Sequence, residues 1–294
     1  MKRTAKVVTG VAGLTAGLAV VVGLSSLSGC GQEKGLPSAD VVSKEAPAVP
    51  PTAMVPAASE DAARRVVERA VKATTDGQPG RLDKARVTRT TAKGHFYKTV
   101  GTQQRFVETN RVFQAAYPDK VRVDYEFTGE GGRTISIGLR RPAGVWARDT
   151  GGESPVQDSP QFADMVAVDA AGTHWMLTLT PLTDPKAVVY GLATRSAGGR
   201  PFDTIKASVP SFPVVYTLWF DQATGLLAKV EYANLEGGVL ITKVVALSEH
   251  KPFGGLTLPT KIDFTRNGQG AENWTVESWE FPDKIDDAAF EQPK

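Results

Sequence analysis

Apolar and polar side chains alternate with a period of two along most of the chain from about residue 86 to its end. The segment 121–127, VRVDYEF, shows this most clearly, because Val121, Val123, Tyr125 and Phe127 are separated by charged residues. Successive side chains of a strand point to opposite faces, so the pattern predicts an antiparallel strand with one buried and one solvated face. Similar patterns predict strands at 133–140, 144–149, 186–194, 203–209, 213–220, 226–233, 239–248, 257–265 and 272–281.

A helical spacing replaces this alternation at 59–73. Five small apolar residues recur there at intervals of three and four and form one helical face: Ala63, Val66, Val67, Ala70 and Val71. Ser59 is suited to cap the N-terminus of this helix, and Gly77 and Pro79 are suited to end it. We therefore expect one helix before the strands, and the small side chains on its apolar face should let it lie close against a sheet.

A second helix is predicted midway, at 159–170, where Pro160 occupies an early helical position and Phe162, Met165 and Val166 follow. The next segment, 172–184, is apolar throughout, and its pattern fits a further strand as well as it fits a helical piece.

The connections between the predicted strands are short. DQATG at 221–225 predicts a compact hairpin loop, and 251–259 is a second turn-rich joint. Such connections leave no room for repeated crossover helices, so the sheet should be antiparallel. We predict an α+β, mainly β fold, in which roughly nine to eleven strands form one large curved sheet.

Two predicted strands are apolar on both faces. In 213–220, Tyr216 and Phe220 point one way while Val215 and Trp219 point the other, and 239–248 is similar. Central strands of any sandwich have this composition. Alternatively, one face packs on an ordinary core, and the other borders a cavity or a second covering layer.

Five tryptophans fall in or near predicted strands: Trp146, Trp175, Trp219, Trp274 and Trp279. Trp274 and Trp279 are five residues apart, so on a regular strand they point to opposite faces. Rigid aromatic rings on both faces fit a core on one side and an apolar hollow on the other. We predict that these rings contribute to a hydrophobic ligand site, although simple core filling explains each ring equally.

The N-terminal segment has the features of a secretory signal peptide. Residues 1–6 contain three basic residues and no acid, residues 7–24 are uncharged and largely apolar, and small residues follow. The alternative is an uncleaved transmembrane anchor, since a span needs about 20 apolar residues. The stretch ends at Cys30, the only cysteine of the chain.

The residues after Cys30 lack a periodic apolar face. Five prolines within 31–57 predict an extended tether of polyproline character: Pro37, Pro47, Pro50, Pro51 and Pro56. The chain has a formal net charge of +2, and residues 1–29 carry three positive side chains, so the remainder carries −1. No basic face is implied, and nucleic acid is not an expected partner.

Enzyme motifs are missing from the sequence. His95, His174 and His250 are far apart and show no metal-ligand spacing, and neither a G-x-S-x-G motif nor a phosphate loop occurs. GEGGR at 129–133 joins two predicted strands as a turn, and the acidic 282–287 segment lacks the spacing of a calcium loop. We therefore expect no enzyme activity, no metal and no cofactor.

Two resemblances add to this interpretation. Leu27-Ser28-Gly29-Cys30 resembles the lipobox of bacterial lipoproteins, which implies that Cys30 receives a diacylglyceryl group and becomes the first residue of the mature chain. The region 58–293 resembles the LolA/LolB-like lipoprotein-carrier superfamily through AARRVVERAVKA, YPDKVRVDYEF, LWFDQATGLLAKVEY, GLTLPTKIDF and KIDDAAFEQP.

The second resemblance implies an incomplete β-barrel whose open mouth is plugged by helices. It also implies that the midway helix acts as a lid, so Phe162 and Met165 join the expected ligand-binding residues. Members of this superfamily bind lipids, or the acyl chains of lipoproteins, in the hollow, or act as envelope sensors.

These observations predict a signal peptide at 1–29, a tether at 30–57 and a LolA-like domain at 58–294. The expected function is that of a lipid-anchored envelope protein, facing the periplasm or exterior, that binds a lipid or acyl chain. The alternative is a non-enzymatic structural or sensing module that contacts another envelope protein. An unrecognised hydrolase would instead show a compact polar cluster in the cavity.

Overall fold

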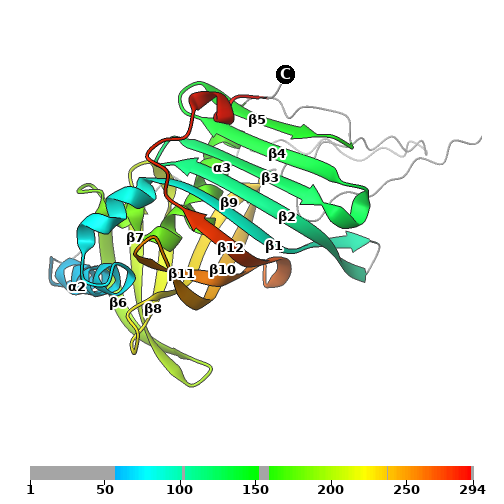
Figure 1. The fold of residues 1–294 in the computed structure, drawn as a ribbon. Coiled ribbons are helices and arrows are strands. Elements are labelled where there is room, and N and C mark those ends of the chain that lie inside the picture. The colour runs from blue at the N-terminus through cyan, green and yellow to red at the C-terminus, as the bar shows by residue number, and fades with distance from the viewer. Residues whose placement is uncertain (1–56, 101–102, 152–158, 237, 293–294) are drawn as a thin grey trace, which may run out of the picture.

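The computed structural model describes residues 57–100, 103–151, 159–236 and 238–292. The predicted signal peptide, Cys30 and nearly all of the predicted tether lie outside the described residues. The described part contains one twelve-stranded sheet, two α-helices and short 3₁₀ turns (Figure 1). None of the helices in these ranges is long and apolar enough to span a bilayer.

Two antiparallel meanders make up the sheet. The first contains β1 (Val87–Val100), β2 (Gln103–Ala116), β3 (Lys120–Phe127), β4 (Arg133–Arg140) and β5 (Gly144–Asp149). The second contains β6 (Val188–Ala197), β7 (Arg200–Val209), β8 (Phe212–Asp221), β9 (Leu227–Glu236), β10 (Val239–Phe253), β11 (Leu256–Arg266) and β12 (Gln269–Glu280).

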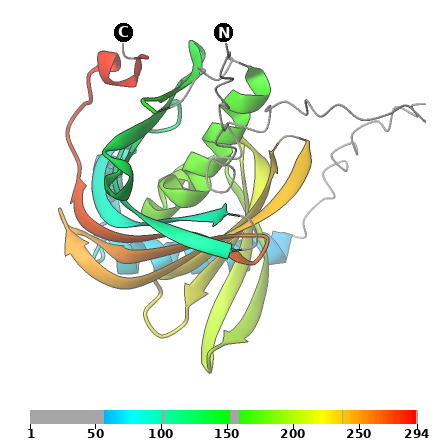
Figure 2. The same ribbon diagram turned by 90° about the vertical axis from the view of Figure 1, so that its right-hand side faces the viewer.

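Pairing of β1 with β12 joins the meanders in the order β5-β4-β3-β2-β1-β12-β11-β10-β9-β8-β7-β6. The sheet curves strongly, and β5 and β6 remain its two edges, so the barrel is not closed (Figure 2). The predicted fold class, a mainly β protein with an incomplete antiparallel barrel, is confirmed.

The observed strand number exceeds the prediction of nine to eleven because β1 and β2 were not recognised individually. The inward positions at the start of β1 hold Thr88, Thr90 and Ala92, which are buried but small or polar. Their contrast with the polar outward positions is weak, so the alternation that marks a strand is weak as well.

Helix α2 (Ala57–Thr74) confirms the first predicted helix and packs against β6 and β11 (Figure 1). Its predicted face is buried through Ala63, Val66, Val67 and Ala70. The predicted cap is wrong, because the helix begins two residues before Ser59. The Ser59 hydroxyl instead accepts a hydrogen bond from the Gly191 backbone N–H at 3.0 Å.

Helix α3 (Pro160–Thr173) confirms the second predicted helix and lies inside the concave face of the sheet (Figure 2). Its first turn is fixed by Ser159, whose hydroxyl accepts a hydrogen bond from the Phe162 backbone N–H at 3.2 Å. The helix contacts β4 and β5 on one side and β8 and β9 on the other, so it bridges the two halves of the open barrel.

The ambiguous segment after α3 forms two 3₁₀ turns, η3 (Trp175–Thr178) and η4 (Thr180–Thr183), rather than a strand. Leu179 lies between them with a positive φ of 61°. The whole segment is buried, which explains why its composition is apolar without alternating.

Close contacts hold α3 against β8 and β9. A Cβ placed on Gly172 would lie 2.3 Å from the Tyr232 ring, so only glycine fits at this crossing. The Tyr216 hydroxyl donates to the Val168 carbonyl at 2.9 Å, and the Asn234 amide donates to the Met165 carbonyl at 3.1 Å. Core and cavity therefore lie on the same, concave side of the sheet.

Among the described residues, no element covers the convex face of the strands that are apolar on both sides. Val215 and Leu240 point outward and are exposed. Trp219 also points outward, and it is buried only because Phe202, Arg195 and Lys229 pack on it. The expectation that the second apolar face would border a cavity or a second layer is thus wrong.

Candidate binding cavity

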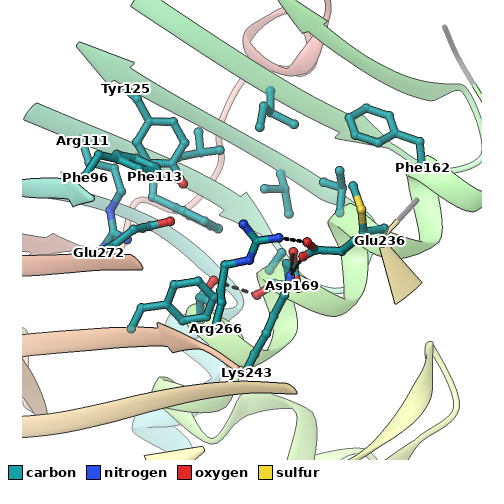
Figure 3. Close-up of a pocket in the computed structure, with 18 residues that line it drawn as sticks. Phe96, Arg111, Phe113, Tyr125, Phe162, Asp169, Glu236, Lys243, Arg266 and Glu272 are labelled. Atoms are coloured by element: carbon teal, nitrogen blue, oxygen red, sulfur yellow. Dashed lines mark hydrogen bonds and ion pairs between the residues drawn. The ribbon is translucent and has the colours of Figure 1, made fainter. Parts of the chain in front are cut away.

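A cavity of about 110 Å³ lies between α3 and the concave face of the sheet (Figure 3). One wall is apolar. It is formed by side chains of β1 to β4 and by the inner face of α3: Phe96, Phe113, Val121, Val123, Ile137, Phe162, Met165 and Val166. These side chains alternate with outward-pointing polar residues along each strand, so the period-two pattern of the sequence produces this wall.

The opposite wall is charged. It is formed by four residues from consecutive strands β9 to β12, one residue of α3 and one of β2: Glu236, Lys243, Arg266, Glu272, Asp169 and Arg111. The cavity is thus amphipathic: most of its apolar side chains come from β1 to β4 and α3, and its charged side chains come from β9 to β12 together with Asp169 of α3 and Arg111 of β2. Figure 3 shows the labelled charged residues.

Four of these charges form a connected network. Lys243 is only 2% exposed in its side chain, and its ammonium lies 2.6 Å from Oδ2 and 2.7 Å from Oδ1 of Asp169. Glu236 forms ion pairs with both Lys243 and Arg266. Lys243 and Arg266 are cross-strand partners, so Glu236 separates two adjacent cations that would otherwise repel each other. Buried charges persist only with such partners.

Arg111 stands apart from this network. Arg111 is 6% exposed, and its guanidinium lies 4.5 Å from the centre of the Trp274 ring. Its Nε has no hydrogen-bond partner in the part of the chain that the structure describes. Desolvation lowers the pKa of Arg111 from its ordinary value, and the nearby Tyr125 and Glu272 oppose that shift. A guanidinium remains charged at neutral pH under these conditions.

Glu272 is the acidic neighbour of Arg111. Its Oε2 accepts a hydrogen bond from the Trp274 indole at 2.8 Å. Burial raises the pKa of Glu272 above its ordinary value, and the charges of Arg111 and Lys243 only partly oppose this effect. Burial likewise raises the pKa of Tyr125, whose phenol extends from β3 toward the same region (Figure 3).

Comparisons with solved structures give the fold a precedent. No protein-family model matches the chain, and no curated protein matches its sequence. A LolA superfamily protein from Nitrosomonas europaea superimposes with a TM-score of 0.50 at 12% identity, covering 78% of this chain and 97% of that one. The chain has a LolA-like fold.

Two further structures superimpose over the same share of each chain. One is a domain named for outer membrane lipoprotein sorting from Vibrio parahaemolyticus, with a TM-score of 0.44 and 11% identity. The other is a DUF1329 family protein from Desulfovibrio piger, with a TM-score of 0.43 and 14% identity. Each covers 78% of this chain and 97% of the other.

Two of the predicted ligand-binding residues, Phe162 and Met165, line the cavity of this LolA-like domain from α3. Trp274 lies beneath the lining, between Arg111 and Glu272. Trp175 packs in the core against Phe212, with ring centres 5.4 Å apart.

The other three predicted rings lie elsewhere in the fold. Trp279 is in the core, stacked on His174 at 5.2 Å. Trp219 lies on the convex face, and so does Trp146, whose ring covers Gly138 and whose indole donates to the Phe290 carbonyl. Phe290 belongs to the C-terminal turn η5 (Asp287–Phe290).

A β-bulge overturns the prediction that Trp274 and Trp279 point to opposite faces. In the pairing with β1, Ala92 is opposite Val276 and Thr91 is opposite Ser278, so Glu277 is an extra residue on β12. An extra residue reverses the alternation beyond it. Both tryptophans therefore point inward.

The histidines do not contribute to the cavity. His174 is buried at the end of α3, its Nε2 lies 2.6 Å from the Thr88 hydroxyl, and burial lowers its pKa to about 3. His95 and His250 bond to Asn273 and to the Leu227 carbonyl respectively. Within the described ranges no cluster of metal-ligating side chains occurs, and the lining contains no serine, cysteine or histidine.

Sequence reasoning named no residue of the charged wall, and it assigned a polar cluster in the cavity only to the hydrolase alternative. The available signal was a charged residue at an inward position of an apolar strand. Lys243 interrupts ITKVVAL, and Arg111 alternates with Phe113 on the inward side of β2. Such a residue is buried wherever the alternation holds, and a buried charge requires a partner or a ligand.

Proposed function

We propose that this protein is a non-enzymatic, lipid-anchored protein of the bacterial envelope that binds the acyl chain of a lipid or lipoprotein beneath α3. The observation that carries the proposal is the apolar wall. Phe162 and Met165 of α3 and the apolar side chains of β2 to β4 line an open space rather than closing on one another. Acyl chains gain free energy from such surfaces through buried area, without hydrogen bonds.

The size of the cavity adds a condition. Its 110 Å³ is below the roughly 300–1,000 Å³ of ordinary small-molecule sites. A long acyl chain therefore needs α3 to move away from the sheet, or must extend beyond the cavity. The position of α3, packed on both halves of an unclosed barrel, is compatible with such movement.

Anchoring is supported by the sequence alone. A signal peptide that ends in Leu-Ser-Gly-Cys, followed by a proline-rich tether, fits a lipoprotein whose domain is held some distance from the membrane. Two or more acyl chains hold a protein firmly, since each buried CH₂ contributes about 0.8 kcal/mol.

Bound lipid is tested by extracting the purified full chain with chloroform and methanol, followed by mass spectrometry. The expected result is a lipid released in roughly one-to-one ratio, because non-covalent ligands are extracted whereas a group on Cys30 stays with the protein. Replacing Met165 and Val166 by aspartate should abolish the released lipid. Recovery of the same lipid from the double variant would contradict the proposal.

Anchoring is tested by growing cells with a palmitate analogue that carries a clickable tag. The wild-type chain should be labelled and found with membranes, and Cys30→Ala should lose the label. Ser38→Ala, in the tether, is the matched control and should behave as wild type. Labelling of Cys30→Ala would contradict the assignment.

A second candidate is a structural or sensing module that contacts another envelope protein. It is favoured by Leu235 and Leu240, cross-strand partners on the convex face that are 61% and 64% exposed. Cross-linking in cells should then capture one protein partner that Leu235→Ser with Leu240→Ser no longer captures, and extraction should release no lipid.

A further inference from the structure

The cavity offers more than an apolar surface, because its charged wall contains one cation that forms no ion pair with any described residue. Among the described residues that line it, Lys243 and Arg266 are held by Asp169 and Glu236. Arg111 forms no ion pair within this set, and its Nε has no acceptor. A guanidinium that is 94% buried with a free donor is a costly arrangement, and a bound anion would relieve it.

The surroundings of Arg111 are shaped for a ligand that is apolar at one end. Arg111 and Phe113 are inward neighbours on β2, and Tyr125 is the cross-strand partner of Arg111 on β3. The apolar wall includes Phe113 of β2, Val123 of β3 and Phe162 of α3. A head group at Arg111 would thus place its chain along this wall.

The charges of the cavity lining limit the head group of the ligand to about one negative charge. The lining carries three cations and three anions, and the network formed by Lys243, Arg266, Asp169 and Glu236 is balanced. Glu272 is the only other carboxylate of the lining, and it already accepts from the Trp274 indole. When Glu272 binds a proton, Arg111 is left with one uncompensated positive charge.

We infer that the cavity selects acyl-chain ligands with a singly charged anionic head group, which Arg111 binds while the chain lies on the apolar wall. This inference rests on the proposed acyl-chain binding and names its ligand class. A carboxylate and a phosphodiester share the required chemistry, since both present oxygens that accept from a guanidinium. Glu272 competes with the head group, so it sets the strength of the selection.

The test uses two photoactivatable probes with the same sixteen-carbon chain and the same diazirine. One probe ends in a methyl phosphodiester, which carries one negative charge, and the other ends in a neutral alcohol. Each is cross-linked to the full chain in detergent micelles, and labelled peptides of β2, β3 and α3 are quantified by mass spectrometry. The anionic probe should reach half-saturation at about tenfold lower concentration.

Variants separate the head-group site from the chain site. In Arg111→Met the two probes should reach half-saturation at about the same concentration. The alcohol probe should still label this variant, which also shows that the variant is folded. Arg105→Met, an exposed arginine on the same strand, is the control and should keep the preference. Glu272→Gln should increase the preference severalfold.

Competition with a sixteen-carbon fatty acid at pH 8.5 tests whether the site accepts a carboxylate head group as well as a phosphodiester. Displacement of the anionic probe shows that either head is accepted, and its failure restricts the class to phosphodiesters. Equal labelling by both probes, or an unchanged preference in Arg111→Met, overturns the head-group inference while acyl binding stands. If neither probe labels the residues of the cavity, the proposed function itself is overturned.

Discussion

The Lys243 ammonium lies 2.6 Å from the Asp169 carboxylate, and this contact joins strand β10 to helix α3 at the charged wall of the cavity. Since Glu236 also pairs with Lys243, one lysine balances charges from the sheet and from the helix. The position of α3 over the sheet is therefore stabilised by electrostatics as well as by packing.

Removing this lysine should destabilise the protein strongly. Lys243→Met leaves Glu236 buried with one cation fewer and Asp169 without its ion-pair partner, so we expect the free energy of unfolding to fall by about 3–5 kcal/mol. Urea unfolding followed by tryptophan fluorescence measures this change. Lys93→Met removes an exposed ion pair with Glu277 and should cost less than about 1 kcal/mol. Equal effects of the two variants would contradict a structural role for the network.

The close approach of Gly172 to Tyr232 leads to a second prediction. Gly172→Ala places a methyl group against the ring and should cost about 1–3 kcal/mol through overpacking. Gly80→Ala, which meets no atom within 4 Å, is the matched control in the same thermal unfolding experiment. The double variant Gly172→Ala with Tyr232→Leu should recover part of the loss, because the two positions are in direct contact. Strict additivity would argue against the clash.

The structural effect of the bulge at Glu277 should depend on the extra backbone residue and not on the glutamate side chain. Deleting Glu277 restores regular alternation and turns Trp279 toward the convex face, so the stack with His174 is lost. We expect loss of the near-UV circular dichroism signal and a fall of several degrees in the melting temperature. Glu277→Ala keeps the residue count and should leave both nearly unchanged. A deletion variant that melts like wild type would show that the register is not fixed.

His174 should make stability depend on pH. Its pKa is about 3 in the folded protein and about 6.5 when solvated, so the unfolded chain binds a proton more readily at mildly acidic pH. Stability is thus fully present above pH 6.5 and falls as the pH drops toward 3, by about 2 kcal/mol between pH 6.5 and 5.

His174→Gln should flatten this dependence, even though it lowers stability at neutral pH by removing the ring stacked on Phe113 and Trp279. His95→Gln, on the convex face, is the control and should retain the slope. Urea midpoints measured from pH 5 to 7.5 check both variants. A slope that survives in His174→Gln would assign the effect to other groups.

Protonation of Glu272 should strengthen ligand binding as the pH falls, whereas protonation of His174 should lower stability. Burial raises its pKa, so lowering the pH neutralises it above its ordinary range and removes its competition with an anion at Arg111. The other ionisable groups near it are Asp169, Lys243 and Tyr125. Labelling by the phosphodiester probe should therefore strengthen from pH 8 to 6, and Glu272→Gln should remove this dependence. A pH-independent preference in the wild type would contradict the competition.

The sequence predicted the features that local chemistry determines. The alternation of Val121, Val123 and Tyr125 predicted the buried face of β3, and Pro160 indicated where α3 begins. A large antiparallel sheet with two helices follows from such patterns, because each element shows which of its faces must be buried. The open barrel with an inner helix was implied by the resemblance to the LolA/LolB-like superfamily.

Features that depend on pairing between distant segments were not predictable. The direction of Trp279 depends on one extra residue in β12, which becomes visible only from the register with β1. The partners of Lys243 come from α3 and from the end of β9, far away in the sequence. A single inward lysine indicates that a partner exists, but not which residue it is.

The unpaired edges β5 and β6 determine how much the bore of this barrel can vary. In a closed barrel the circumference is set by continuous backbone hydrogen bonds, and widening requires breaking them. Here the two halves meet across the seam through α3 and through contacts between loops, such as the hydrogen bond from the Arg141 guanidinium to the Ser211 carbonyl, and none of these contacts is a strand pairing. A change in the bore of this barrel would therefore cost contacts across the seam while every strand pair stays intact.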